Sequence, residues 1–357
     1  MRIALDATPL TLQSGGLRRY VAELASALAE EFTDDEIWLL SDQKFETPRS
    51  IPARVRTGQG PRNFLERRWW LWGVRQEMSR LGIDVFHGTD FAVPYLASRP
   101  SVMTLHDLSP WMNSAWHSDA SRVRMRTPVL LRLGLATMVI TPSEAIRKQA
   151  IDRFRLTPDR VVAIPHAAAS FFRPVAGSRN GTPYFLYVGT LEPRKNLDLL
   201  LDVWREVRRE FPIDLVLAGR RRSDWKELAP EPGLRFTGFT RDEDLPGLLS
   251  GAMAFVYPSS YEGFGLPVLE AMQCGAAVIA SRDAAISEVA GDAAILVDSS
   301  DRQSWAETLR GLASDPSLLA PLREKALARS AEFSWARTAR RTREVYAQAQ
   351  ERWRRNA

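Results

Sequence analysis

The chain has 357 residues and a formal net charge of +5, with 45% hydrophobic and 25% charged residues. This length exceeds what one ordinary core organises, so we expect two domains of a globular protein. Because no stretch of about 18 apolar residues is present and Cys274 is the single cysteine, neither a transmembrane helix nor an internal disulfide is expected, and a cytoplasmic location is favoured.

Short apolar runs, typical of buried parallel strands, alternate with helical patterns through the first half of the chain. They span residues 3–7, 35–42, 84–89, 101–107, 137–143 and 161–166. A Gly-rich turn, SGG (14–16), leads from the first run into a helical pattern. It lacks the full G-x-G-x-x-G dinucleotide pattern, but its backbone N–H groups could still bind a phosphate. His106 and Asp107 close the run 101–107, just past the expected strand end, where a histidine is either packed or functional.

The segment 62–82 mixes arginines with Trp69, Trp70 and Trp72. Basic and aromatic residues together suit a membrane interface or a lipid-linked acceptor. Leu65, Trp69 and Trp72 also have helical spacing, so part of this segment is expected to pack against the core. We therefore predict peripheral membrane contact through the first half of the chain, while core packing remains the alternative.

A Gly-, Pro- and Ser-rich stretch at 170–183 predicts a linker, after which a second series of strands and helices begins. Its apolar runs span 184–190, 214–220, 234–239, 252–259, 276–281 and 293–298. The pattern predicts an α/β chain with two doubly wound sheets in tandem. Ligands bind beyond the carboxyl ends of the strands in such sheets, so we expect a binding cleft between the two domains.

The strongest motif is YEGFGLPVLEAMQCG (261–275), in which Glu262 and Glu270 flank a Gly-rich turn that opens a helix. Gly263 and Gly265 would let a phosphate approach the helix N-terminus, where backbone N–H groups and a partial positive charge lie. Glu270, about 6 Å along the helix axis from Leu266, could accept hydrogen bonds from a diol such as ribose. The motif suits a nucleotide diphosphate attached to a polyhydroxylated group.

Other strand ends support this site. The loop GTLEPRKN (189–196) carries Arg194 and Lys195, two cations suited to a diphosphate. Asn196 is expected to cap the helix that follows. Strand-end positions at which backbone could contact a flat base are Gly219, Gly238 and Phe239. In contrast, Asp242-Glu243-Asp244 matches the metal motif D-x-D, but it is better explained as an acidic helix start, so no metal site is expected.

Together these segments resemble the retaining GT-B glycosyltransferases of family 4, which include the mannosyltransferase-like group 1 enzymes. The resemblance rests on SGG, TLHDL, TPSEAIR, YVGTLEPRKN and two glutamates with seven residues between them. It implies an acceptor domain at 1–170, a donor domain at 171–335 and a tail helix at 336–357 that crosses back to the first domain. The apolar face of that tail, with Trp335, Val345 and Tyr346, would then pack there.

The resemblance also implies a role for each matching residue. Glu262 would contact the donor sugar near the reacting carbon, and Glu270 would bind the ribose hydroxyls. Arg194 and Lys195 would neutralise the leaving diphosphate, and His106 would contact the donor sugar. The backbone positions expected to contact the donor are Gly15, Gly16, Gly189, Thr190, Gly263, Phe264, Gly265 and Leu266. Two departures are Thr190, where some members carry arginine, and Ala167, where glycine is usual.

The expected activity is metal-independent, retaining transfer of a hexose from a nucleotide-diphospho-sugar to a glycan or a lipid-linked saccharide. GDP-mannose is the first expected donor and a UDP-sugar the second; no separate cofactor is expected. The resemblance also allows a location at the inner face of the membrane. Two alternatives remain open at this point, a UDP-sugar epimerase of the same architecture and a catalytically silent sugar-nucleotide-binding protein. The loop at 109–120 is expected to face the acceptor, but no motif in its sequence identifies which acceptor binds.

Overall fold

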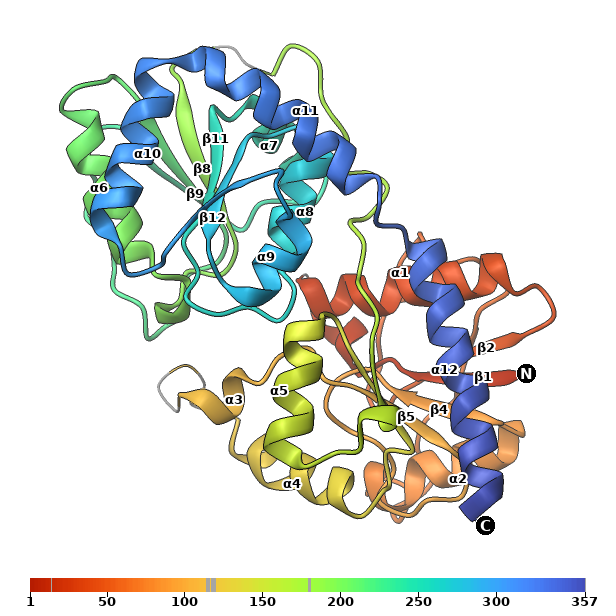
Figure 1. Cartoon of the computed structure of the whole chain (residues 1–357). Coiled ribbons are helices and arrows are strands. Elements are labelled where there is room, and N and C mark those ends of the chain that lie inside the picture. Colours follow the sequence, from red (N-terminus) through yellow and green to blue (C-terminus); the bar gives the residue numbers. More distant parts are fainter. Residues whose placement is uncertain (14, 114–115, 117–119, 179–180, 357) are drawn as a thin grey trace. The chain divides into compact units, whose positions relative to one another are not determined.

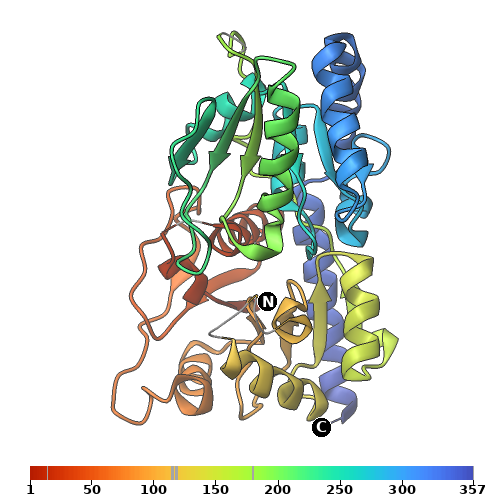
Figure 2. The same cartoon turned by 90° about the vertical axis from the view of Figure 1, so that its left-hand side faces the viewer.

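The computed structural model describes the chain except for residues 14, 114–115, 117–119, 179–180 and 357. The backbone forms two compact units (Figure 1). The first comprises Met1–Ala167 together with Ser334–Ala357, and the second comprises Ala168–Phe333. Each unit is built around one parallel sheet with helices on both faces, as the alternating strand and helix patterns predict (Figures 1 and 2).

The sheet of the first unit has the strand order β3-β2-β1-β4-β5-β6-β7. Its strands are β1 (Arg2–Asp6), β2 (Glu36–Leu40), β3 (Arg56–Thr57), β4 (Val85–Gly88), β5 (Ser101–Thr104), β6 (Met138–Thr141) and β7 (Val161–Ala163). Its α-helices are α1 (Gly16–Glu31), α2 (Val74–Leu81), α3 (Ser109–Met112), α4 (Ser121–Arg132), α5 (Glu144–Phe154) and α12 (Trp335–Asn356). Strand order reverses between β1 and β4, and such a switch point forms a ligand-binding crevice in doubly wound sheets.

The sheet of the second unit has the strand order β10-β9-β8-β11-β12-β13 and switches between β8 and β11. Its strands are β8 (Tyr184–Val188), β9 (Asp214–Ala218), β10 (Leu234–Gly238), β11 (Ala254–Tyr257), β12 (Val278–Ser281) and β13 (Ile295–Val297). Its α-helices are α6 (Leu197–Arg208), α7 (Leu245–Gly251), α8 (Leu266–Gln273), α9 (Ala284–Ala290), α10 (Arg302–Ser314) and α11 (Leu319–Ser330). Short 3-10 turns, η5 (Pro193–Lys195) among them, complete this unit.

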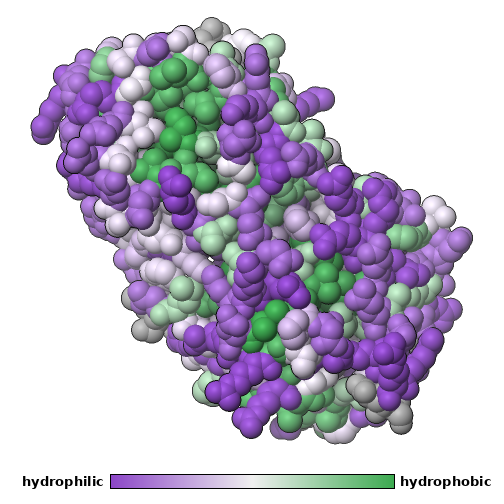
Figure 3. All heavy atoms as spheres, viewed as in Figure 1, coloured by the Kyte–Doolittle hydropathy of each residue, from purple (hydrophilic) through white to green (hydrophobic). Residues whose placement is uncertain are grey.

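All twelve expected strands are present, and every hydrogen-bonded pair in both sheets is parallel. Most are buried on both faces, which is why their sequences are continuous apolar runs rather than alternating ones. The sequence pattern missed β3, because Arg56–Thr57 is a two-residue edge strand without an apolar run. None of the described helices combines the length and apolar character needed to cross a bilayer, and hydrophilic residues cover most of the face drawn in Figure 3.

The tail helix α12 packs within the first unit, against α1 and strands β4 to β6. Its expected apolar face is buried, with Val345 and Tyr346 almost fully inaccessible. The Tyr346 hydroxyl lies 2.7 Å from Nδ1 of His87, and Arg343 donates to Asp35 at 2.5 Å. These contacts show how the tail is held: its apolar face packs against the first unit, and Arg343 pairs with an acidic group of the same unit.

Candidate active site

The switch point of the second unit brings together the loops that follow β8 and β11. Lys195 lies in the turn η5 after β8, and Glu262 lies in the loop after β11. The Lys195 Nζ donates to Glu262 Oε1 at 2.5 Å and to the Tyr257 hydroxyl at 2.9 Å. The Tyr257 hydroxyl in turn donates to the same Oε1 at 3.0 Å. Two residues that are distant in sequence therefore form one buried charged cluster.

Arg194 joins this cluster from the other side. Its guanidinium lies 3.4 Å from Glu262 Oε2 and donates to the Tyr261 carbonyl at 2.6 Å. It also pairs with Glu192 at 2.8 Å, and Glu192 pairs with Arg222 at 2.9 Å. A chain of alternating charges thus fixes the position of the two predicted cations.

The charges in this cluster determine how its groups ionise. Burial alone would raise the pKa of Glu262, but Lys195 and Arg194 outweigh burial and lower this pKa to about 2. Burial and the neighbouring Arg194 lower the pKa of Lys195, while Glu262 opposes that change. Glu262 is therefore a carboxylate with very weak basicity, a group suited to accept hydrogen bonds rather than to take up a proton.

The Gly-rich turn ends at the N-terminus of α8. Gly265 is the N-cap residue with φ of 95°, a left-handed conformation that favours glycine, and α8 begins at Leu266. Glu270 is buried in the helix that follows, with 2% of its surface exposed. Phe264 and Gly263 are also buried. The turn places the first backbone N–H groups of α8 beside the Glu262 loop, as the sequence predicts.

Three of the predicted glycines lie side by side at the carboxyl edge of this sheet. The Gly189 N–H donates to the Ala218 carbonyl, and the Gly219 N–H donates to the Gly238 carbonyl, both at 2.9 Å. A Cβ on Gly219 would lie 1.9 Å from the Gly189 carbonyl oxygen, so only glycine fits there. Next to them, Thr190 is exposed.

Phe239 follows Gly238 at this edge, with 49% of its surface exposed. The Arg220 guanidinium lies over its ring at 4.8 Å. The predicted base-contacting positions Gly219, Gly238 and Phe239 therefore lie together at the ends of β9 and β10.

Asn196 was expected to cap α6 with its side chain, and this expectation was wrong. Asn196 occupies the N-cap position, but its backbone is left-handed (φ 54°) and its side chain makes no capping hydrogen bond. The side-chain amide instead donates to the Ser299 carbonyl at 2.8 Å. It ties the cation-bearing turn to the segment after β13.

In the first unit, Gly15 is the N-cap of α1 with φ of 116°, and Gly16 is the first helical residue. Ser14, which begins the SGG motif, lies outside the described residues. His106 follows β5 and is partly buried beside Tyr20, with 4.8 Å between ring centroids. Its Nε2 lies 2.7 Å from the Thr89 carbonyl, which can only accept, so this nitrogen carries the proton. Burial lowers the pKa of His106, so it acts as a neutral donor.

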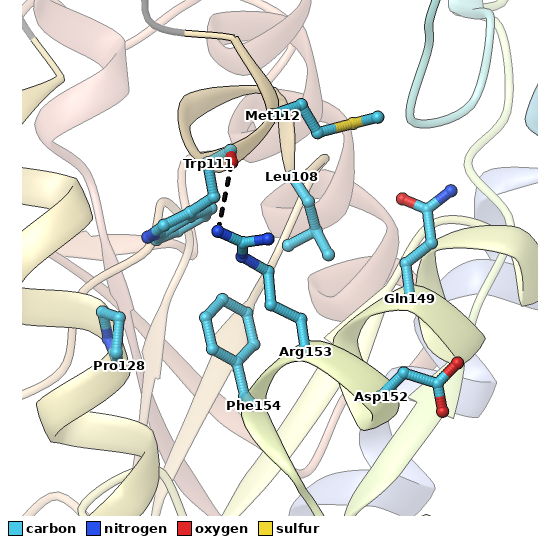
Figure 4. Close-up of a pocket in the computed structure, with 8 residues that line it drawn as sticks. All are labelled: Leu108, Trp111, Met112, Pro128, Gln149, Asp152, Arg153 and Phe154. Atoms are coloured by element: carbon cyan, nitrogen blue, oxygen red, sulfur yellow. Dashed lines mark hydrogen bonds between the residues drawn. The ribbon is translucent and has the colours of Figure 1, made fainter.

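A pocket of about 720 Å³ lies near this edge of the first unit, beside α3, α4 and α5 (Figure 4). Its lining residues are Leu108, Trp111, Met112, Pro128, Gln149, Asp152, Arg153 and Phe154. Arg153 donates to the Trp111 carbonyl at 3.1 Å, as the dashed line shows. This pocket adjoins the loop at 109–120, part of which (114–115 and 117–119) lies outside the described residues.

The basic and aromatic segment is more exposed than its helical spacing predicts. Trp69 is buried, as the core-packing alternative requires, but Leu65 is 66% exposed and Trp72 is 40% exposed. The reason is local. Residues 64–67 form turns, and a short π-helix (η2, Trp69–Gly73) precedes α2, so the three residues do not share one helix face. Phe64 is also exposed.

The D-x-D segment lies before α7, where Asp244 is the N-cap residue and pairs with Arg241 at 3.0 Å. Sequence reasoning missed three residues of the cluster: Tyr257, Glu192 and Arg222. The one signal for Tyr257 was a polar hydroxyl at the carboxyl end of an apolar strand.

Comparison with known proteins identifies the family. Residues 169–329 match the family model of "Glycosyl transferases group 1", and residues 14–168 match that of "Glycosyltransferase Family 4". The O-antigen chain mannosyltransferase B of Escherichia coli is 30% identical, over 97% of this chain and 99% of its own. Serotype-specific mannosyltransferase WbdA of the same organism is 31% identical over 67% of this chain, which corresponds to 32% of WbdA.

Solved structures share the fold at lower sequence identity. Sucrose-phosphate synthase from Thermosynechococcus elongatus superposes with a TM-score of 0.78 at 22% identity, over 97% of this chain and 98% of its own. WaaG, a glycosyltransferase involved in lipopolysaccharide biosynthesis, gives 0.74 at 15% identity, over 97% and 99%. The two parallel-sheet units thus form the GT-B architecture, and the chain belongs to the family 4 (group 1) glycosyltransferases.

Proposed function

We propose that the protein transfers a hexose, with mannose from GDP-mannose as the first choice and a UDP-sugar as the second, to a glycan or lipid-linked saccharide. The mannosyltransferase names of its relatives support the choice of sugar. The observation that carries the proposal is the cluster of Lys195, Arg194 and Glu262 beside the N-terminus of α8. The cluster combines two cations held in place by ion pairs with the backbone N–H groups of α8, at the position where a diphosphate would leave the donor sugar.

The cluster has capacity left for such a ligand. An ammonium group has three N–H donors, and the contacts of Lys195 use two of them, on Glu262 and Tyr257. The third can bind a phosphate oxygen, and the α8 N-terminus adds backbone N–H groups. Two cations positioned in this way can neutralise the charge that develops on the leaving diphosphate, which supports a metal-independent reaction.

Retention of anomeric configuration is the stereochemistry we propose. Glu262 is ion-paired with two cations and its pKa is about 2, so it is a poor nucleophile and a poor base. We therefore assign it to the hydroxyls of the donor sugar, and we assign the proton of the acceptor to the leaving phosphate, on the same face of the sugar. Glu270 is assigned to the ribose diol. From the family resemblance, we assign His106 and the backbone at Gly15 and Gly16 to the donor as well.

The proposed donor is tested by thermal unfolding with GDP-mannose, UDP-glucose and an ADP-sugar, each in the presence of EDTA. A ligand at 100 times its dissociation constant stabilises the folded state by about 2.7 kcal/mol. We expect GDP-mannose to raise the melting temperature most, with EDTA making no difference. A shift produced by none of the three, or only after a divalent cation is added, would contradict the proposal.

We also propose peripheral contact with an anionic membrane through the segment 62–72. Phe64 and Leu65 are 77% and 66% exposed, and Trp72, in the same segment, is 40% exposed. Arg62, Arg67 and Arg68 are exposed as well. Apolar side chains that insert at the headgroup level, among arginines that attract anionic lipid, are the features of interfacial binding.

Sedimentation with vesicles tests this contact. The wild-type protein should sediment with vesicles that contain phosphatidylglycerol, and the double variant Phe64→Ser/Leu65→Ser should sediment several-fold less. The matched control is Phe236→Ser, since Phe236 is similarly exposed (48%) but lies in the second unit. Equal sedimentation of the two variants would reject the segment as the contact site.

A further inference from the structure

Asp90 lies at the switch point of the first sheet, in a part of the chain that the sequence analysis did not single out. It follows β4, the strand next to β1 at which the strand order reverses. The carbonyl of the preceding residue, Thr89, accepts the hydrogen bond from His106. Asp90 therefore directly follows a residue that contacts a proposed donor-binding side chain, in the crevice where doubly wound sheets bind ligands.

Three carboxylates, Asp6, Asp90 and Asp107, lie at or just after the carboxyl ends of central strands at this edge, and two of them accept hydrogen bonds from nearby residues. Asp6 accepts from the Thr8 hydroxyl at 2.7 Å and from the Thr8 N–H at 3.1 Å. Asp107 accepts from the Ser109 hydroxyl at 2.6 Å and from its N–H at 2.9 Å. Among the described residues, Asp90 makes no hydrogen bond or ion pair, and its Oδ1 is buried without a partner. The side chain as a whole is only partly exposed.

The backbone beside Asp90 is strained and firmly held. Phe91 has φ of 53°, a left-handed conformation that bulky side chains rarely adopt. Its N–H donates to the Thr104 carbonyl at 3.2 Å, and its own carbonyl accepts from the Thr127 hydroxyl at 2.9 Å. Strained residues that several hydrogen bonds hold in place cluster at binding sites, where they pre-organise a side chain.

A donor group accompanies the carboxylate. The Arg126 guanidinium is close enough to Asp90 to interact electrostatically with it, but the two form no ion pair among the residues the structure describes. Arg126 Nε is buried and, within the same residues, has no hydrogen-bond partner. Asp90 supplies an acceptor, and Arg126, whose Nη2 also donates to the Phe91 carbonyl at 3.4 Å, supplies a donor nearby. An acceptor and a donor that lie near each other match a hydroxyl group, which donates to one and accepts from the other.

An unpartnered, partly buried carboxylate costs free energy, since it loses hydration without gaining a hydrogen bond. No hydrogen bond among the described residues offsets this cost, but hydrogen bonds from the hydroxyl groups of a ligand would. We propose that Asp90 is a specificity residue that accepts hydrogen bonds from hydroxyls of the acceptor sugar, with Arg126 as the accompanying donor. This inference rests on the proposed transfer reaction and names the chemistry by which the first unit recognises a polyhydroxylated acceptor.

The test uses the full-length Asp90→Asn variant with methyl α-mannoside and a panel of other methyl hexosides as acceptors. We expect kcat/KM for the acceptor to fall about 10- to 100-fold, as for a site that loses one or two hydrogen bonds to a charged group. The KM for the donor should not change, and the melting temperature should be equal or higher because a buried unpaired charge is removed. Asp84→Asn, at the amino end of the same strand, is the matched control and should keep wild-type acceptor kinetics.

A structural role for Asp90 predicts the opposite pattern, namely a lower melting temperature with an unchanged acceptor KM. That pattern would overturn the proposal, as would a wild-type enzyme that uses none of the hexosides. Donor binding is measured separately by the thermal shift with GDP-mannose. A protein that binds the donor but shows no effect of Asp90→Asn on the acceptor refutes this inference and leaves the proposed function standing.

Discussion

Replacing Lys195 with methionine should lower kcat for sugar transfer by about 10²- to 10³-fold, the effect of removing one pre-organised donor to a developing negative charge. The aliphatic part of the side chain is kept, so packing around Tyr257 should change little. Glu262 keeps its contact with Arg194 at 3.4 Å and the hydrogen bond from the Tyr257 hydroxyl, so the variant should fold. Steady-state kinetics with saturating donor measure the effect on kcat.

The matched control is Lys226→Met in the same unit. Lys226 pairs with Asp198 at the surface and is 53% exposed, so its loss should leave kcat within about twofold, since exposed ion pairs contribute little. If Lys195→Met retained wild-type kcat while remaining folded, Lys195 would not act on the leaving group, and the cluster would be structural only.

The largest expected effect on stability comes from Glu262→Gln. The substitution preserves shape but removes the negative charge, so Lys195 and Arg194 remain buried without their shared partner. Breaking a buried ion pair from one side typically costs about 3–5 kcal/mol in the free energy of unfolding. Lys195→Met alone should cost less, because Glu262 still has Arg194. Urea unfolding, followed by circular dichroism, measures both variants.

The double variant Lys195→Met/Glu262→Gln provides the internal control for this prediction. It removes both charges together, so it should recover most of the stability that Glu262→Gln loses, and the coupling between the two sites should be strongly favourable. Additive losses in the double variant would show that the two residues do not stabilise each other, contrary to the 2.5 Å contact between them.

The sequence allowed much of this architecture to be predicted, for definable physical reasons. Parallel strands buried on both faces are continuous apolar runs, and each expected run became a strand in one of the two sheets. The Gly-rich turn before α8 could be predicted because glycine is required there: Gly265 has φ of 95°. The cations Arg194 and Lys195 could be placed near Glu262 because both loops leave the carboxyl ends of neighbouring strands.

What could not be predicted depends on side-chain partners rather than on pattern. Nothing in the sequence shows that Tyr257 joins Lys195 to Glu262, or that Glu192 pairs with Arg222, because these pairs form across loops after different strands. Asparagine is a residue type that commonly caps helices, but the side chain of Asn196 instead donates a hydrogen bond to the Ser299 carbonyl. Likewise, only the structure shows that Asp90 Oδ1 is buried without a hydrogen-bond partner among the described residues.

A crystal structure of the protein with bound GDP would show directly where the diphosphate binds. We expect diphosphate oxygens to lie within hydrogen-bond distance of the Lys195 ammonium and of backbone N–H groups at the start of α8, with the ribose near Glu270. A diphosphate bound elsewhere in the chain, with Lys195 still enclosed by Glu262 and Tyr257, would contradict this expectation.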